Sequence, residues 1–122
     1  MDTASATTNG GVGVSVYVSI GNSDNHLTQA EWGQFTWDVK RLIQTHAEDI
    51  FGEWYSLPNS EWQNACWCFI PEGSSVDDLR RQLGHVCRRY RQDSIMWSES
   101  VDYPVGPGGS DAEVSMVGNA IQ

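Results

Sequence analysis

VGVSVYVSI, residues 12–20, decides the fold of this chain, because aliphatic residues alternate with small or polar ones over nine positions. Successive side chains of a strand point to opposite faces, so an alternation with period two indicates a strand. One face of this strand is entirely aliphatic and must pack on other elements. The other face carries Tyr17 among glycine and serine residues. The stretch therefore predicts a sheet that is covered on one face.

A helix is predicted to follow. Thr28 and Glu31 have the spacing of a capping box, in which each side chain bonds the backbone amide of the other residue. Apolar residues then recur every three or four positions, as on one face of a helix. The stripe consists of Trp32, Phe35, Val39, Leu42, Ile43, His46 and Ile50. It is expected to cover the aliphatic face of the first strand, and Gly52 is the expected end of the helix.

The remaining elements complete a βαββαβ order. EWYSL at 53–57 and WQNACWCFI at 62–70 indicate two strands joined by a turn. Ser75, followed by two acids, opens a second helix, and SIMWSESVDY at 94–103 indicates the last strand. This order predicts an α+β domain of ferredoxin-like βαββαβ type, a four-stranded antiparallel sheet with two helices on one face.

The two ends of the chain differ in composition from this central unit. Residues 1–11 are small and polar, and we expect them to form a disordered N-terminal tail. Residues 106–122 are expected to form a flexible C-terminal tail. A single α+β domain is therefore expected to span residues 12–105.

WQNACWCF, residues 62–69, is expected to be a central strand whose two faces differ. The residues expected under the helices are Cys66, Cys68 and Ile70. The residues expected on the uncovered face are Trp67 and Phe69, together with Tyr17. Soluble monomers seldom leave such an aromatic patch bare, so we expect either a homo-oligomer or a stacked ligand to cover it.

The formal net charge of −9 limits what the 122-residue chain can bind. Nucleic-acid binding needs Lys and Arg to displace counterions, so general nucleic-acid binding is not expected. No apolar run approaches the ~18 residues that span a bilayer, and the first residues lack the pattern of a secretory signal. We therefore expect a cytoplasmic protein without a membrane segment.

Cys66, Cys68 and Cys87 are expected to be reduced thiols. Cys66 and Cys68 are two residues apart in a strand, where a disulfide between them is geometrically awkward. A zinc site would need a second cysteine pair or a matched histidine spacing, which the sequence lacks. Neither a metal nor a cofactor is expected.

Three stretches give the chain a family resemblance: SIGNSDNHLTQAEWGQF at 19–35, WQNACWCF at 62–69 and RYRQDSIMW at 89–97. They resemble small uncharacterised proteins of actinobacteria and of their phages, over about residues 14–103. The resemblance implies a fold and a possible phage or actinobacterial source, with a bacterial cytoplasm as the compartment. It implies no activity and no catalytic residues.

Three stretches also supply candidate ligand-binding residues. The loop GNSDNH at 21–26 precedes a helix N-terminus, whose amides attract anions, although turn formation explains the loop equally. WQN at 62–64 offers indole surfaces and amides near Trp54, and the arginines of the second helix suit a phosphate or simply the helix dipole. The candidates are Asn22, Ser23, Asp24, Trp54, Trp62, Gln63, Asn64, Arg88, Arg89, Arg91 and Gln92.

The sequence favours a binding protein over an enzyme, because no nucleophile or carboxylate pair has a recognisable frame. The expected ligand is small and polar, with a nucleotide-like or phosphorylated molecule as the candidate. The phage resemblance implies a counter-defence role that sequesters an immune signal. One alternative is a small dimeric ferredoxin-like enzyme with His26, His46 or Asp24 as the acid-base group. The other is an acidic inhibitor of a protein interaction.

Overall fold

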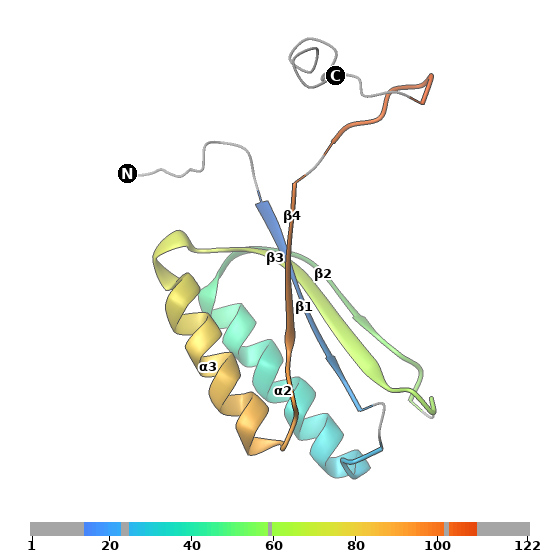
Figure 1. Ribbon diagram of the computed structural model, residues 1–122, viewed down its shortest axis with the longest axis vertical. Coiled ribbons are helices and arrows are strands. Elements are labelled where there is room, and N and C mark those ends of the chain that lie inside the picture. Colours follow the sequence, from blue (N-terminus) through green and yellow to red (C-terminus); the bar gives the residue numbers. More distant parts are fainter. Residues whose placement is uncertain (1–13, 23–24, 59, 102, 110–122) are drawn as a thin grey trace.

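The computed structural model describes residues 14–22, 25–58, 60–101 and 103–109. These residues form an α+β unit in which four strands and two helices follow one another along the chain, with one 3-10 turn (Figure 1). The elements are β1 (Val14–Gly21), α2 (Gln29–His46), β2 (Ala47–Tyr55), β3 (Asn64–Pro71), η1 (Gly73–Ser75), α3 (Val76–Arg89) and β4 (Met96–Val101). The predicted tail at 1–11 and most of the predicted tail at 106–122 lie outside the described residues.

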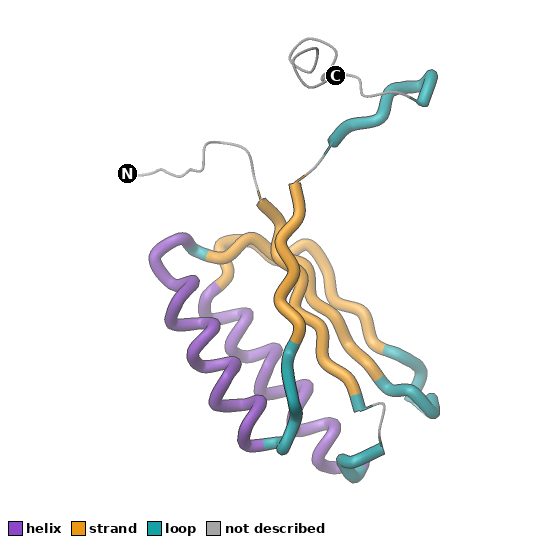
Figure 2. The backbone as a smooth tube through the Cα atoms, viewed as in Figure 1, coloured by secondary structure: helices purple, strands orange, loops and turns teal. Residues whose placement is uncertain are grey.

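The strands form one antiparallel sheet in the order β2-β3-β1-β4. β1 and β3 are the central strands, and β2 and β4 lie at the two edges. Both helices lie on the same side of this sheet, as the ribbon and the tube views show (Figures 1 and 2). The sequence prediction of a four-stranded antiparallel sheet with two helices is therefore confirmed.

The aliphatic face of β1 lies under the helices as predicted. Val16, Val18 and Ile20 are buried and belong to the same cluster as Phe35 of α2 and Leu79 of α3. The other members from the helices are Val39, Ile43, Leu83 and Val86. Both described helices cover this face of the sheet, and no helix of the described residues lies on the opposite face (Figure 2).

The prediction for the two faces of β3 is wrong. Trp67 and Phe69 are fully buried under the helices, whereas Cys66, Cys68 and Ile70 point to the other face. The reason is the register, in which Val18 pairs with Trp67 and Val16 pairs with Phe69. Directly paired residues share a face, so the aliphatic face of β1 places these aromatic side chains in the core.

The end of the first helix also differs from the prediction. α2 ends at His46 and β2 begins at the next residue, so Ile50 and Gly52 lie in a strand. Pairing with β3 accounts for this, because the ladder runs from Ala47 opposite Pro71 to Tyr55 opposite Ala65. The ladder shifts register twice, between Ala47 and Asp49 and between Ile50 and Gly52. The spacing of apolar residues by three and four positions, which suggested a longer helix, carries no information about the pairing of β2 with β3.

The two helices are joined by polar and aromatic contacts as well as by the core. The ring of Tyr90, at the end of α3, stacks on Phe35 with ring centroids 4.9 Å apart. Its hydroxyl donates to Oδ2 of Asp38 in α2 at 2.6 Å. Burial, followed by this bond to the carboxylate, raises the pKa of Tyr90 to about 12. Neither described helix is long and apolar enough to cross a membrane.

Candidate functional site

Many of the predicted ligand-binding residues lie at one end of the molecule. Here the loop after β1, the start of α2, the start of β3 and the end of α3 come together, at the lower end of Figure 1. We call this region the polar end and define it by Asn22, His26, Gln29, Glu31, Gln63 and Arg91. Residues from the sequence stretches 19–35, 62–69 and 89–97 all contribute to it.

The centre of the polar end is a pair of buried amides. Asn22 is 0% exposed and Gln63 is 4% exposed. The Asn22 side chain accepts from the Leu27 amide at 2.9 Å, and donates to the Leu27 carbonyl at 3.1 Å and to Oε1 of Gln63 at 3.2 Å. Gln63 also exchanges hydrogen bonds with Gln29, at 2.8 and 3.0 Å. These bonds tie the loop after β1 to the start of β3 and to the first turn of α2.

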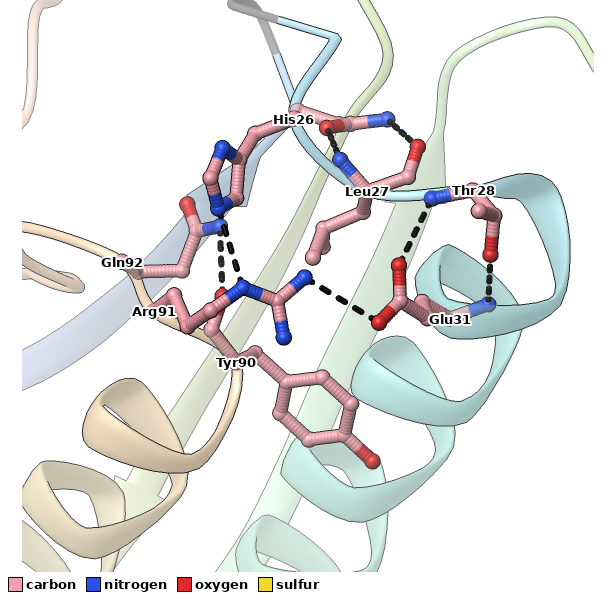
Figure 3. A network of polar contacts seen from close by, with 8 residues as sticks. His26, Leu27, Thr28, Glu31, Tyr90, Arg91 and Gln92 are labelled. Carbon is pink, nitrogen blue, oxygen red and sulfur yellow. Dashed lines mark hydrogen bonds and ion pairs between the residues drawn. The ribbon is translucent and has the colours of Figure 1, made fainter.

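The start of α2 carries the capping box predicted from the sequence. The Glu31 amide donates to Oγ1 of Thr28 at 3.1 Å, and the Thr28 amide donates to Oε1 of Glu31 at 2.9 Å. Arg91 then reaches Oε2 of the same carboxylate at 3.1 Å and donates through Nε to Nε2 of His26 at 3.0 Å (Figure 3). The Thr28 amide and then Arg91 lower the pKa of Glu31.

Arg91 adopts a strained backbone conformation that places its side chain in this network. Its φ is 57°, in the left-handed region that glycine usually occupies after a helix. The amides of Arg91 and Gln92 donate to the carbonyls of Arg88 and Cys87, which is the Schellman pattern at the end of α3. The guanidinium contacts with Glu31 and His26 offset the strain, so an arginine stands where glycine is more common.

The helix-free face of the sheet has a different chemistry. Residues that pair across the four strands form rows on this face. One row contains Gly52, Cys68, Tyr17 and Ser98, and the next contains Trp54, Cys66, Ser19 and Met96. We call the region made by these eight residues the open face. Its floor consists of small side chains, and Trp54, Tyr17 and Met96 are exposed upon it. Asn64 continues β3 beyond the second row.

The indole of Trp54 extends along β2 over Gly52 of the same strand. A Cβ atom added at Gly52 would lie 3.0 Å from Cη2 and 3.1 Å from Cζ2 of Trp54, so the indole covers Gly52. Tyr17 lies two strands away, on the other side of Cys68. Cys68 is buried although no described helix covers it, which is explained by a ring on each side. Two aromatic rings therefore flank a narrow floor.

The structure brings together only part of the predicted ligand site. Asn22 and Gln63 lie in contact, with Arg91 and Gln92 at the same end, but their side chains are bonded to other residues of the chain. Trp54 and Asn64 belong to the other side of the sheet, and Trp62 is exposed in the turn before β3. Arg88 and Arg89 end α3 in the helical layer. Ser23 and Asp24 lie outside the described residues.

His46 forms an ion pair and a backbone hydrogen bond. Nε2 of His46 lies 3.0 Å from Oδ2 of Asp78, and its Nδ1 lies 2.9 Å from the Leu42 carbonyl. Both partners are acceptors, so the ring is the doubly donating imidazolium. Burial opposes this charge, but the bonds to Leu42 and Asp78 outweigh it and raise the pKa of His46. The same ion pair, with the neighbouring Arg81, lowers the pKa of Asp78.

Metal and thiol chemistry have little support in the described part of the chain. Among the described residues, no group of three or more His, Cys, Asp or Glu side chains could hold a metal ion. Cys66, Cys68 and Cys87 are free thiols. Burial and the nearby Asp93 raise the pKa of Cys87, which makes it a poorer nucleophile.

Sequence reasoning missed two parts of this arrangement. The long-range contact of Arg91 with Glu31 joins residues 60 positions apart, and local spacing does not predict it. The place of Gly52 under Trp54 depends on β2 starting at Ala47. The faces of β3 could have been assigned by pairing it with β1, because a covered aliphatic face requires the largest apolar side chains opposite it.

Comparisons with known proteins add no assignment. No family model matches the chain, and no curated protein matches it. Among solved structures, the chain is similar to a candidate amidohydrolase/peptidase from Burkholderia cenocepacia, with 14% identity and a TM-score of 0.28. The match covers 78% of this chain, which spans 29% of that protein. At this TM-score the likeness assigns neither a fold nor a function.

Proposed function

We propose that the protein is a non-enzymatic binding protein whose open face holds a small, planar, polar ligand such as a nucleobase or a nucleoside. The observation that carries the proposal is the arrangement of Trp54 and Tyr17. The indole of Trp54 lies over Gly52, and Tyr17 lies on the far side of Cys68. A planar ring can stack on either aromatic side chain while it rests on the small residues between them.

The spacing of the strands supports stacking. Neighbouring strands lie ~4.8 Å apart, so Gly52 and Tyr17 are separated by about 10 Å across β3. Stacked aromatic rings have centroids 4.5–7 Å apart, so a ligand between the two side chains can contact one ring or both. Ser19 and Ser98 supply hydroxyl groups beside this space, and such groups fix the orientation of a polar ligand.

The charge distribution favours an uncharged ligand. The open face contains no Asp, Glu, Lys or Arg, and Asp49, paired with Ile70, is the nearest strand carboxylate in register. Arg88 and Arg89, which the sequence suggested as phosphate-binding residues, lie in the helical layer and not on the open face. With a net charge of −9 and no cation on the open face, the chain should bind a nucleoside better than the corresponding nucleotide.

The proposal extends to the finer class of the fold. We assign the domain to the ferredoxin-like arrangement on the βαββαβ order of its elements and on the placement of both helices against one side of the sheet. Domains of this kind that bind RNA stack bases on aromatic side chains of the helix-free face. The open face resembles such a surface in position, without the basic residues that RNA requires.

Calorimetric titration with adenosine, guanosine and uridine tests the proposal, with the corresponding 5′-monophosphates and a cyclic dinucleotide as charged competitors. We expect at least one nucleoside to bind and its monophosphate to bind more weakly. Stacking of a base on one aromatic side chain contributes about 1–3 kcal/mol by alanine substitution, so Trp54→Ala should weaken binding about 5- to 150-fold.

Trp37→Ala is the matched control for this titration. Trp37 is 50% exposed and Trp54 is 54% exposed, but Trp37 projects from α2 in the helical layer and packs under the guanidinium of Arg41. The control should keep the affinity of the unaltered chain. If no nucleoside or nucleotide binds, or if both substitutions reduce affinity equally, the open face is not a ligand site. Native mass spectrometry of the same sample would then show whether a second subunit covers it.

A further inference from the structure

We infer a second binding site, separate from the open face, in a pocket between α2 and the edge strand β2, where the ligand is a small aromatic carboxylate. The pocket has a volume of about 210 Å³. It is lined chiefly by Lys40, Ile43 and Gln44 of α2, Phe51 and Glu53 of β2, and Trp67 of β3. Ile50 and Gly52 complete the lining, and Gly52 is the one residue that the pocket shares with the open face.

The irregularity of β2 creates this pocket. The register of β2 against β3 shifts between Ile50 and Gly52, at the strand residues that line the pocket. A bulge bends the strand locally, which leaves space between β2 and the helix. Trp67 is fully buried and Ile43 is fully buried, whereas Phe51 is 55% exposed. The pocket therefore has a rigid inner wall and one aromatic side chain near its opening.

The polar groups of the pocket differ in how many further hydrogen bonds they can make. The Glu53 carboxylate accepts from Nε1 of Trp67 at 3.1 Å, from the Tyr55 hydroxyl at 2.9 Å and from Nζ of Lys40 at 3.3 Å. Burial is the largest influence on Glu53 and opposes its charge, but these three bonds outweigh burial and lower its pKa. A carboxylate has about four acceptor positions, so Glu53 is nearly saturated.

Lys40 has donors to spare. An ammonium group has three N–H donors, and among the described residues Lys40 makes one polar contact, the ion pair with Glu53. The unused donors border a pocket whose walls include the apolar side chains of Ile43, Phe51 and Trp67, so they favour a ligand that brings an acceptor oxygen on an apolar body. A charge-assisted hydrogen bond to a carboxylate is stronger than one to a neutral group, which selects the acid over its amide.

The size of the pocket limits the ligand to about one ring. A water molecule takes about 30 Å³ in the liquid, so 210 Å³ corresponds to roughly seven waters. Sites for drug-sized ligands are larger, about 300–1,000 Å³. A single ring with a short acidic arm, such as phenylacetate or benzoate, fits these limits.

The sequence offers a specific probe of this site, because Lys40 is the only lysine in the chain. Protein grown with lysine labelled with ¹³C at Cε gives one lysine Cε–Hε signal in an NMR correlation spectrum. Titration with phenylacetate should move this signal in a saturable manner. Phenylacetamide should bind about tenfold more weakly, because it lacks the charge that strengthens the bond to Lys40.

Two substitutions distinguish the pocket from nonspecific binding of an anion. Lys40→Met removes the ammonium and keeps an unbranched apolar side chain, and should weaken phenylacetate binding about tenfold by calorimetry. Arg41→Met removes a neighbouring cation that lies over the Trp37 ring, 5.7 Å from its centroid, and should leave binding unchanged. Phe51→Ala should also weaken binding, and Phe51 is exposed enough that the fold should tolerate the change.

Three results would overturn the inference. They are a Lys40 signal that does not move at millimolar phenylacetate, equal binding of the acid and the amide, and equal loss on Lys40→Met and Arg41→Met. If benzylamine bound better than phenylacetate, the pocket would prefer a cation to an anion, and this result would also overturn the inference. Because the open face carries neither Lys40 nor Phe51, substitutions at these two residues test the pocket without removing an aromatic side chain of the open face.

Discussion

The polar end and the open face belong to the same α+β unit, but the polar end buries polar side chains whereas the open face exposes apolar ones. At the polar end, Asn22 and Gln63 are buried and are bonded to one another and to the adjoining backbone. On the open face, Trp54 and Met96 are exposed above a floor of small residues. A buried amide that is fully paired stabilises the fold, whereas an uncovered aromatic surface gains by binding something. We therefore expect the polar end to contribute to stability, and we propose that the open face contributes to recognition.

The largest expected effect comes from breaking the polar end at Asn22. Asn22→Ala removes the side-chain partners of the Leu27 amide and carbonyl, and one of the two donors to Oε1 of Gln63. A buried polar group that loses its hydrogen-bond partner costs about 1–3 kcal/mol. We therefore expect a loss of roughly 2–4 kcal/mol in the free energy of unfolding. Urea denaturation measures this loss. Asn64→Ala is the control, because Asn64 is exposed, and it should change stability by less than about 0.5 kcal/mol. Equal effects at the two positions would contradict the assignment.

A second prediction concerns acid stability at the polar end. The folded-state pKa of Glu31 is lowered by the Thr28 amide and by Arg91. Its contribution to stability is therefore present above the ordinary glutamate pKa and is lost as the pH falls through the lowered value. Glu31→Gln keeps a capping-box residue but removes the charge, so its urea midpoint should fall less steeply between pH 6 and pH 3. If the urea midpoint of Glu31→Gln changed with pH in parallel with that of the unaltered chain, the Arg91 contact would contribute nothing to stability.

His46 gives a pH dependence of the opposite sign, away from both regions. Its pKa is raised, so its contribution is complete below the unfolded-state pKa of about 6.5 and is lost as the pH rises through the folded-state value. Stability should therefore decline from pH 6 toward alkaline pH, and the decline should be absent in His46→Gln. The unfolding midpoint, followed by circular dichroism at several pH values, measures it. His26→Gln is the control and should keep the decline.

The smallest expected effect on stability belongs to the open face. Gly52→Ala adds a methyl group where the Trp54 indole lies, at 3.0 Å from Cη2. Trp54 is exposed and can move away, so stability should change by less than about 0.5 kcal/mol. The position of the indole should nevertheless change, and nucleoside affinity should fall with it. If Gly52→Ala displaced the NMR signal of the Trp54 indole but left the nucleoside affinity unchanged, Trp54 would not be the stacking surface.

The sequence predicted the class of the fold and the sheet because its strongest signals are local. The alternation at 12–20 and the Thr28–Glu31 capping box depend on neighbouring residues alone, and the structure shows the capping box and, within the described residues, a strand from Val14 to Gly21. The end of α2 was mispredicted because pairing with β3 overrides the helical periodicity of residues 47–52. The faces of β3 were reversed because the cysteines were taken as core residues without regard to register.

The candidate site was less predictable for a related reason. The sequence drew attention to Trp54 and Asn64, but it grouped them with the arginines of the second helix, which lie in the other layer. Gln63 was chosen for its amide, and its bonds with Asn22 and Gln29 depend on three segments meeting. The pocket at Lys40 depends on a register shift in β2, which has no local sequence signal. Local pattern identifies reactive residue types, but register decides which of them meet.

The most direct test of the central claim is an NMR titration of ¹⁵N-labelled protein with the nucleoside that binds best. The indole N–H signals of Trp54 and Trp37 and the side-chain amide signals of Asn22 and Gln63 would be assigned by substitution. We predict that the Trp54 signal moves on titration, while the Trp37 signal and both amide signals stay in place. Movement of the Asn22 and Gln63 signals with a stationary Trp54 signal would place recognition at the polar end and contradict the account.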